Sequence, residues 1–171
     1  MNLRKTSWML PALMSVSCAV AAEGVYVGAR VGFMDPDVSG LDEAQNVGIV
    51  LGFEFMSDTL ISAAVEAEFT TTYSDGDVDF AGLNGDWDVD TQALYLVGKL
   101  GEAFYGKLRA GVLREDVSIS IGGISGEGSD SGFSAGLGVG WRAADNVSVE
   151  AEYTLVEEDI DFYSIGANIG F

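Results

Sequence analysis

The residues best placed to do chemistry are charged side chains that recur two positions apart within apolar stretches. The acids are Glu66, Glu68, Glu150 and Glu152, and the bases are Arg30, Lys107 and Arg109. Alternate residues of a β-strand share one face, so each close pair would point the same way. Neighbouring carboxylates can do acid–base work, but salt bridges with the three bases explain this spacing more simply. The pattern therefore predicts an ion-paired network rather than a catalytic site.

The composition argues against most enzymes and against nucleic-acid-binding proteins. The chain has no His, which removes Ser–His and Cys–His nucleophilic pairs and the usual zinc ligand. It has 8 Lys and Arg against 27 Asp and Glu, and a net charge of −19 disfavours contact with phosphate backbones. Apolar residues make up 48%, too many for a disordered acidic tail. We expect no enzymatic activity and no cofactor.

Acids also recur two apart at Asp75, Asp77 and Asp79. This spacing resembles the opening of an EF-hand calcium loop. However, Phe80 stands where that loop requires Gly, and Asp86 holds the twelfth position, where Glu is usual. The calcium site is thus a weak alternative to a solvated acidic rim, which the acids between 157 and 161 would extend. We expect no defined metal site, only loose attraction of divalent cations.

Residues 1–22 are typical of a secretory signal peptide, with Arg4 and Lys5 ahead of an apolar stretch too short to span a membrane. The only cysteine, Cys18, falls within this segment. A lipidated Cys18 is the weaker alternative, because the three residues before it lack the usual Leu. Cleavage after Ala22 would leave residues 23–171 as one domain, with six basic and 27 acidic residues and a net charge of −21.

A period of two runs through the rest of the chain and predicts eight strands of about ten residues. The expected strands cover 24–33, 46–55, 61–69, 87–97, 104–112, 133–142, 147–155 and 163–171. In each strand one face is apolar and the other is mostly Gly, Ser or charged. In the fourth strand we assign Trp87, Val89 and Tyr95 to the apolar face, although Leu94 and Leu96 favour the opposite phase.

The connections between these strands alternate in length. Links at 56–59, 101–103 and 143–146 are tight, whereas links at 34–45, 73–86 and 116–131 are long and rich in Gly, Asp and Ser. An even number of strands with short turns at one end and long loops at the other is typical of an outer-membrane barrel. Both termini would then lie at the periplasmic end, and the long loops would be extracellular.

A soluble, lipocalin-like carrier would show the same period with its faces inverted. Gly is avoided on water-facing strands, so the Gly-rich face fits the interior of a narrow membrane barrel better. The aromatic residues of the apolar faces also sort toward the two ends of the strands, as two membrane-interface girdles require. These residues are Phe33, Phe53, Phe55, Phe69, Trp87, Phe104, Phe133, Trp141, Tyr153, Tyr163 and Phe171.

The opening segment GVYVGARVGF at 24–33 and the closing segment YSIGANIGF at 163–171 resemble the small eight-stranded outer-membrane barrels of Gram-negative bacteria, such as the OmpA transmembrane domain and OmpX. The resemblance covers residues 24–171 and implies an all-β, up-and-down antiparallel transmembrane barrel. It also implies that the final strand carries the signal read by the barrel-insertion machinery. The matching positions are Tyr163, Ile165, Ala167, Ile169 and Phe171.

These observations predict a monomeric barrel in the outer membrane whose lumen is plugged by ion pairs and whose role is structural or surface interaction, such as adhesion. A narrow, cation-preferring channel is the alternative, since four inward acids face three inward bases. The soluble carrier is third. The expected partners are outer-membrane lipid and lipopolysaccharide, together with the insertion machinery, and nucleic acid is not expected. No residue pattern identifies a specific ligand.

Overall fold

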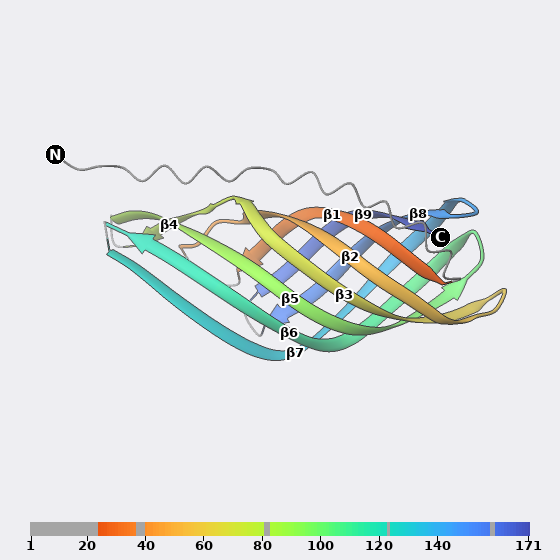
Figure 1. Cartoon of the computed structure of the whole chain (residues 1–171). Helices are drawn as coiled ribbons and strands as arrows, with labels where there is room; N and C mark the ends of the chain where they lie inside the picture. The colour runs from red at the N-terminus through yellow and green to blue at the C-terminus, as the bar shows by residue number, and fades with distance from the viewer. Residues whose placement is uncertain (1–23, 37–39, 81–82, 123, 158–159) are drawn as a thin grey trace.

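The computed structural model describes residues 24–36, 40–80, 83–122, 124–157 and 160–171. The expected signal peptide at residues 1–22, including Cys18, lies outside them. Among the described residues there is no helix of the length and apolarity that would cross a bilayer. What the structure does contain is one large antiparallel sheet, closed on itself (Figure 1).

Nine strands make up this sheet in the described part of the chain. They are β1 (Val25–Pro36), β2 (Ala44–Ser57), β3 (Ile61–Ser74), β4 (Gly76–Phe80), β5 (Leu83–Gly101), β6 (Phe104–Ile121), β7 (Ile124–Ala144), β8 (Val147–Glu157) and β9 (Ile160–Gly170). Strand β1 pairs with β9, and β3 pairs with β5, which closes the barrel. The short β4 pairs with β5 beyond the part of β5 that pairs with β3. The barrel wall therefore has eight strands, which confirms the predicted architecture.

The outer wall of the barrel is apolar and the interior is polar. Leu108, for example, is 68% exposed on the outside, whereas its neighbours Lys107 and Arg109 are buried. A soluble carrier would need the opposite arrangement, with an apolar interior along the whole barrel. The third alternative from the sequence, a lipocalin-like carrier, is therefore wrong, because the apolar faces of these strands point away from the lumen.

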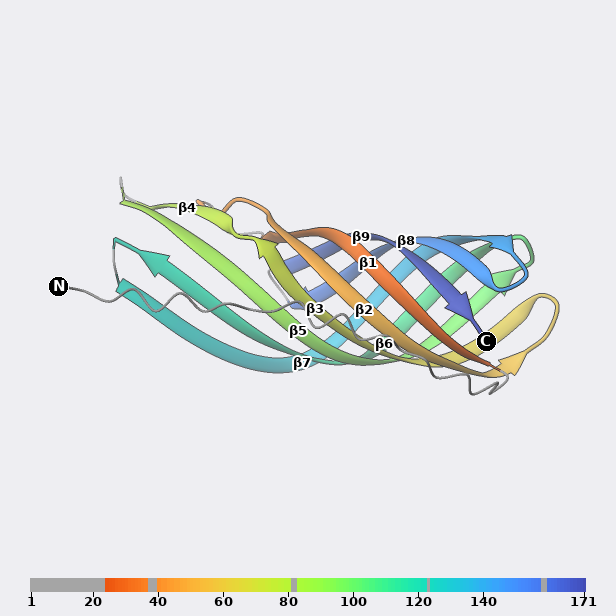
Figure 2. The same cartoon turned by 45° about the horizontal axis from the view of Figure 1, so that its top comes forward.

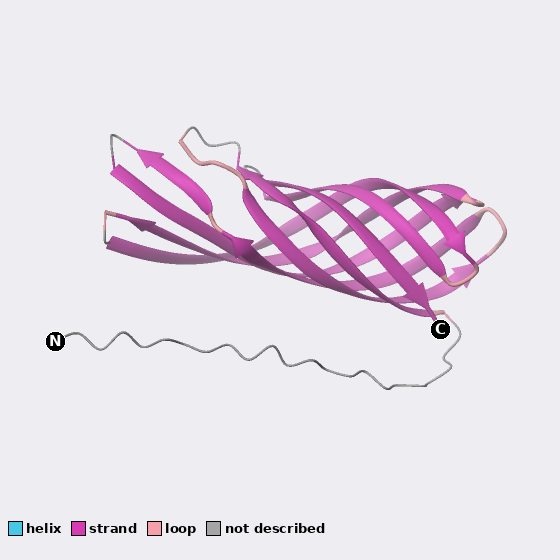
Figure 3. Ribbon diagram, turned by 90° about the horizontal axis from the view of Figure 1, so that it is seen from above, coloured by secondary structure: helices cyan, strands magenta, loops and turns pink. Residues whose placement is uncertain are grey.

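Strands β5, β6 and β7 are much longer than the ten residues expected, at 19, 18 and 21 residues. The links at 73–86 and 116–131 are thus largely strand, not irregular loop. The register of β6 with β7 continues without a break to Ile121 and Ile124. Figures 2 and 3 show β4 to β7 projecting beyond the barrel at the end opposite the C terminus. We call this part, which consists of β4 and of residues 83–90 in β5, 114–121 in β6 and 124–131 in β7, the projecting sheet.

The phase assigned to the fourth predicted strand is also wrong. In β5, Leu94 and Leu96 lie on the outside, and Trp87, Val89 and Tyr95 point inward, with Trp87 only 2% exposed. The reason is that β5 crosses two environments. Within the barrel wall the apolar side faces out, whereas in the projecting sheet water lies outside and the apolar side chains turn inward. The rule that apolar side chains face outward therefore does not hold over the whole length of β5.

Candidate functional site

The inward faces of four strands bring the predicted charged residues together in the lumen. Arg30 comes from β1, Glu66 and Glu68 from β3, Lys107 and Arg109 from β6, and Glu150 and Glu152 from β8. All seven are buried. We call these residues, together with Lys99 described below, the ion cluster. Each member is held by the two-residue repeat of its strand, so the barrel wall itself fixes its position.

Lys107 lies at the centre of the ion cluster. Its Nζ donates to both carboxylate oxygens of Glu66, at 2.8 and 2.9 Å, and to Glu150 and Glu152, each at 2.9 Å. An ammonium group has three N–H donors, and these acceptors use them all. Three strands on different sides of the lumen are therefore joined through one cation.

The two arginines join the remaining carboxylates. Arg109 binds Glu68 through both terminal nitrogens, at 2.7 and 3.1 Å, and its Nε lies 3.2 Å from Glu152. The Arg30 Nε lies 2.9 Å from Glu68, and other guanidinium nitrogens of Arg30 approach Glu66, Glu150 and Glu152 within 4.0 Å. Each carboxylate thus has more than one basic partner, as charges buried in a narrow lumen require.

Lys99 of β5 is a fourth cation that the sequence analysis missed. Its Nζ lies 3.1 Å from Glu150 and is 4.8 and 5.4 Å from the ring centroids of Tyr26 and Tyr105. The ion cluster therefore contains four acids and four bases. Since acids and bases are equal in number, the ion cluster lacks the excess of acids that favoured a cation-preferring channel. The predicted fourth strand ended at residue 97, so Lys99 was assigned to neither face.

Two tyrosines extend the ion cluster toward the end with the short turns. The Tyr26 hydroxyl donates to Glu66 and the Tyr105 hydroxyl donates to Glu150, both at 2.6 Å. Each tyrosine is paired across the sheet with a glycine, Tyr26 with Gly52 and Tyr105 with Gly140. A Cβ on either glycine would overlap the neighbouring ring. The absence of a side chain at these positions leaves room for the rings in the lumen.

Between the ion cluster and the projecting sheet, the lumen is closed by apolar side chains, which we call the apolar cap. Its principal members are Met34, Val89, Leu113, Val156 and Phe162, each at most 4% exposed. Met34 and Leu113 each lie four residues beyond Arg30 and Arg109 on their strands, about 13 Å along the chain. The ion cluster is thus covered, on the side of the projecting sheet, by a mainly apolar layer that also contains the buried Asn46, whose amide donates to the Val89 carbonyl at 2.9 Å.

Ten of the eleven aromatic residues assigned to the girdles lie on the outer surface or are partly exposed there. Phe33, Tyr153 and Tyr163 form one ring cluster, with centroids 5.2 and 5.1 Å apart, and Phe104 stacks on Trp141. Trp87 is the exception and the girdle assignment is wrong for it. It lies in the projecting sheet, where its indole N–H donates to the Asp42 carbonyl at 2.8 Å.

In β9, Tyr163, Ile165, Ala167 and Ile169 lie on the outside, and Phe171, directly after the strand, is also exposed. Of the acids in the weak calcium pattern, Asp75 and Asp77 are exposed, and the Asp79 side chain lies outside the described residues. The described residues contain no group of three acids that could hold a metal ion. Asp77 instead pairs across the sheet with another acid, Asp86.

Asp88 lies in the projecting sheet near other acids. Partial burial, and then the charges of Asp75 and Asp90, raise the pKa of Asp88 above its usual value. Because the pKa of Asp88 is raised in the folded state, folding favours the protonated carboxyl group. The resulting stabilisation is present below about pH 4 and is lost as the pH rises through the folded-state pKa. At neutral pH the Asp88 charge therefore weakens the projecting sheet.

We predict that Asp88→Asn slows amide hydrogen exchange in the projecting sheet at pH 7, after correction for intrinsic exchange rates. At pH 3, where Asp88 is protonated in both states, the two proteins should exchange alike. Asp145→Asn, at the opposite end of the barrel, is the control and should leave exchange in this sheet unchanged. Equal protection of Asp88→Asn and wild type at pH 7 would contradict the prediction.

The comparisons with known proteins agree with this geometry. The model of the outer membrane protein beta-barrel domain family matches residues 9–171. A comparison with curated protein sequences gave no significant match. Among solved structures, the attachment invasion locus protein Ail of Yersinia pestis is 18% identical, with a TM-score of 0.60 over 88% of this chain and 100% of Ail.

Two further structures have a similar fold. Neisserial surface protein A is 16% identical, with a TM-score of 0.59 over 87% of this chain and 98% of its own. OprG of Pseudomonas aeruginosa is 14% identical, with a TM-score of 0.59 over 87% of this chain and 96% of its own. At these identities the likeness concerns the fold alone. With a family match that covers nearly the whole sequence, the chain belongs to the outer membrane protein beta-barrel domain family and is an eight-stranded barrel of the outer membrane.

Proposed function

We propose that this protein is a non-conducting, non-catalytic barrel that acts through its projecting sheet, as a surface-interaction protein of the cell envelope. In this proposal the short turns and both ends of the mature chain face the periplasm, and the projecting sheet is extracellular. The observation that carries the proposal is the contrast between the two parts of the molecule. The lumen is filled by balanced charges under the apolar cap, whereas three strands continue well beyond the barrel.

The contents of the lumen support the absence of conduction. An ion that crossed the barrel would have to displace the contacts of Lys107 and the arginines, and then pass the buried Phe162 and Met34. Breaking a buried ion pair costs several kcal/mol, and an apolar constriction excludes water. An eight-stranded barrel has an interior narrow enough for side chains to fill, as the ion cluster does here.

The projecting sheet supports an interaction role because one of its edges is open. Strand β7 pairs with β6 as far as Ile124, but its register with β8 begins only at Ala135. Within the described residues, the backbone of β7 from 124 to 134 thus has a partner on one side only. An unpaired edge is a template for an added strand from another chain.

The two sides of this edge favour an extended, basic and partly apolar partner. On the inner face, Ile119 and Ile121 lie next to Gly126 and Ile124, where added side chains would find open space beside apolar surface. On the outer face the sheet carries acids such as Glu127 and Asp116. A second copy of this acidic chain would be repelled. The Yersinia structure is, by its name, that of an attachment protein, which is consistent with an adhesive role.

Planar-bilayer recording on purified, refolded protein tests the plug. We expect no steady conductance above that of the bare bilayer, because the ion cluster and the apolar cap block the lumen. The sample should first show the gel mobility difference between boiled and unboiled protein that marks a folded barrel. Steady, large conductance from such a sample would overturn the plug and favour the narrow channel.

Shortening the β6–β7 hairpin tests the interaction role. Replacing residues 117–128 by an Asn-Gly turn keeps the barrel and removes residues 124–128 of the open edge, together with Ile119 and Ile121 beside it. We expect wild type, but not the shortened protein, to bind a synthetic peptide of alternating valine and lysine. The matched control peptide carries N-methyl groups at alternate amides, which keeps its charge but prevents strand pairing. Equal binding of both peptides would show attraction by charge alone and would contradict the proposal.

A further inference from the structure

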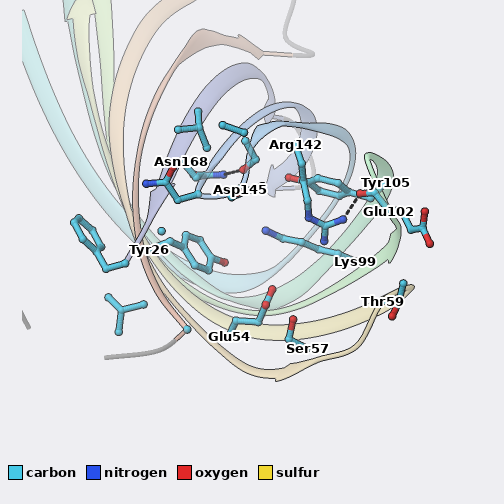
Figure 4. A pocket seen from close by; sticks show the side chains of 18 of the residues that line it. Tyr26, Glu54, Ser57, Thr59, Lys99, Glu102, Tyr105, Arg142, Asp145 and Asn168 are labelled. Atoms are coloured by element: carbon cyan, nitrogen blue, oxygen red, sulfur yellow. Dashed lines mark hydrogen bonds between the residues drawn. The ribbon is translucent and has the colours of Figure 1, made fainter. Parts of the chain in front are cut away.

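The end of the barrel with the short turns contains an open cavity of about 550 Å³, which we call the vestibule. It lies below the ion cluster, among the three turns and the two ends of the described barrel. Figure 4 shows Lys99 and Arg142 projecting into it, with Tyr26 and Tyr105 on either side. The lining mixes both charge signs, aromatic rings and amide groups, so it differs from the ion-filled middle of the lumen.

Arg142 is the residue of the vestibule with unused binding capacity. Its Nη1 donates to the backbone carbonyls of Gly101, at 3.0 Å, and Glu102. Its guanidinium lies over the Tyr105 ring, with 4.8 Å from Cζ to the ring centroid. In the part of the chain that the structure describes, Nε and Nη2 make no hydrogen bond and no carboxylate lies within 4.0 Å. These two nitrogens form the edge of the guanidinium that binds a carboxylate with two parallel hydrogen bonds.

Lys99 adds a second positive charge on the floor of the vestibule. Its single ion-pair partner among the described residues is Glu150, and its ammonium lies over the Tyr26 and Tyr105 rings. Arg142 and Lys99 thus both contact the Tyr105 ring. Because Glu150 already balances Lys99, the positive charge left for an anion in the vestibule is that of Arg142.

The mouth of the vestibule has the opposite charge. Glu54, Asp58, Glu102 and Asp145 line it toward the solvent. This acidic mouth repels a multiply charged anion such as phosphate, but it attracts an ammonium group. A ligand that complements both the cations inside the vestibule and the acidic mouth has a carboxylate at its inner end and an ammonium group at its outer end.

We propose that the vestibule binds short zwitterionic peptides through their C-terminal carboxylate. The carboxylate contacts Nε and Nη2 of Arg142, the peptide body lies against the Tyr26 and Tyr105 rings, and the N-terminal ammonium faces Glu54 and Asp145. The cavity volume suits a peptide of about three small residues. The site opens away from the projecting sheet, so this function is independent of the surface-interaction role.

Titration of tri-alanine into the folded barrel in a non-ionic detergent tests the proposal, with backbone amide chemical shifts of residues around the vestibule as the readout. We expect saturable binding by tri-alanine and at least about tenfold weaker binding by its C-terminal amide, because the amide lacks the charge that Arg142 pairs with. N-acetyl-tri-alanine should lose less affinity than the amide does, since the acidic mouth that faces the N-terminus of the peptide is solvated. Inorganic phosphate should bind more weakly than tri-alanine.

Arg142→Gln should weaken tri-alanine binding about tenfold and remove the preference over the amide. The control is Arg114→Gln, which removes an exposed arginine from the projecting sheet and should leave binding unchanged. If Arg142→Gln does not fold, by gel mobility, the comparison of tri-alanine with its amide on wild type decides alone. Equal binding of the two peptides, absence of saturable binding, or tighter binding of phosphate would overturn the proposal.

Discussion

Lys107→Met should destabilise the barrel by about 3–5 kcal/mol, the cost expected when one partner of a buried ion pair is removed. Methionine has nearly the same length as lysine, so packing is preserved and the change is mainly one of charge. Glu66, Glu150 and Glu152 would lose their common donor and remain buried in a lumen covered by the apolar cap. Urea unfolding in lipid vesicles, followed by tryptophan fluorescence and gel mobility, measures the difference.

Two further variants separate this effect from a general sensitivity to mutation. Arg114→Gln breaks an exposed pair with Asp116 and should change stability by at most about 1 kcal/mol. Lys107→Met combined with Glu66→Gln restores the charge balance of the ion cluster, and it should be more stable than Lys107→Met alone. A loss from Lys107→Met no larger than that from Arg114→Gln would show that the ion cluster is hydrated and does not depend on its charge balance.

Much of the barrel could be predicted from the sequence because the two faces of most strands differ so strongly. The segments around Arg30, Glu66, Lys107 and Glu150 each alternate between a mostly apolar outward face and an inward face rich in Gly, Ser or charged residues. This alternation determines which side faces the lumen. The seven charged residues assigned to the lumen followed from it, since a residue two positions from an inward residue is also inward.

The errors are concentrated where the surroundings of a strand change along its length. In β5 the inward residues are Tyr95 and Lys99 within the barrel, but Trp87 and Val89 in the projecting sheet. The assumption that apolar side chains always face lipid gave the wrong phase there. Lys99 was missed because the predicted strand ended at residue 97, and the charge balance of the ion cluster was missed with it. The link at 116–131 was predicted to be a long loop rich in Gly, Asp and Ser, residues that disfavour strands, yet pairing with β6 keeps residues 124–131 extended.

Partners across the lumen could not be predicted, because they depend on register and strand tilt. Tyr26 and Glu66 are 40 residues apart, and Tyr105 and Glu150 are 45 apart. The sequence indicates that all four side chains point inward, but not that they lie at the same depth. Likewise, the sequence does not indicate that Nε and Nη2 of Arg142 lack a hydrogen bond within the described residues, which follows only from the contacts of the nearby turn.

Gly52→Ala and Gly140→Ala should each destabilise the barrel by about 1–3 kcal/mol, the usual cost of overpacking a filled interior. In each variant the new Cβ would overlap a tyrosine ring, Tyr26 or Tyr105, which would have to move. Movement of either ring would stretch the hydrogen bond from its hydroxyl to Glu66 or Glu150 and shift the aromatic surface under Lys99. The same urea unfolding assay measures both variants.

Gly106→Ala is the matched control, because Gly106 lies in the wall between Tyr105 and Lys107 but faces outward, with no atom near the position of an added Cβ. Alanine lowers the conformational entropy of the unfolded chain, so this variant should be neutral or more stable by up to about 1 kcal/mol. A loss of stability at the two inward glycines, with no loss at the outward glycine, would follow from a lumen that is fully packed. If Gly52→Ala and Gly140→Ala were as stable as Gly106→Ala, the rings would be free to move aside, and the lumen would hold more space than a closed plug allows.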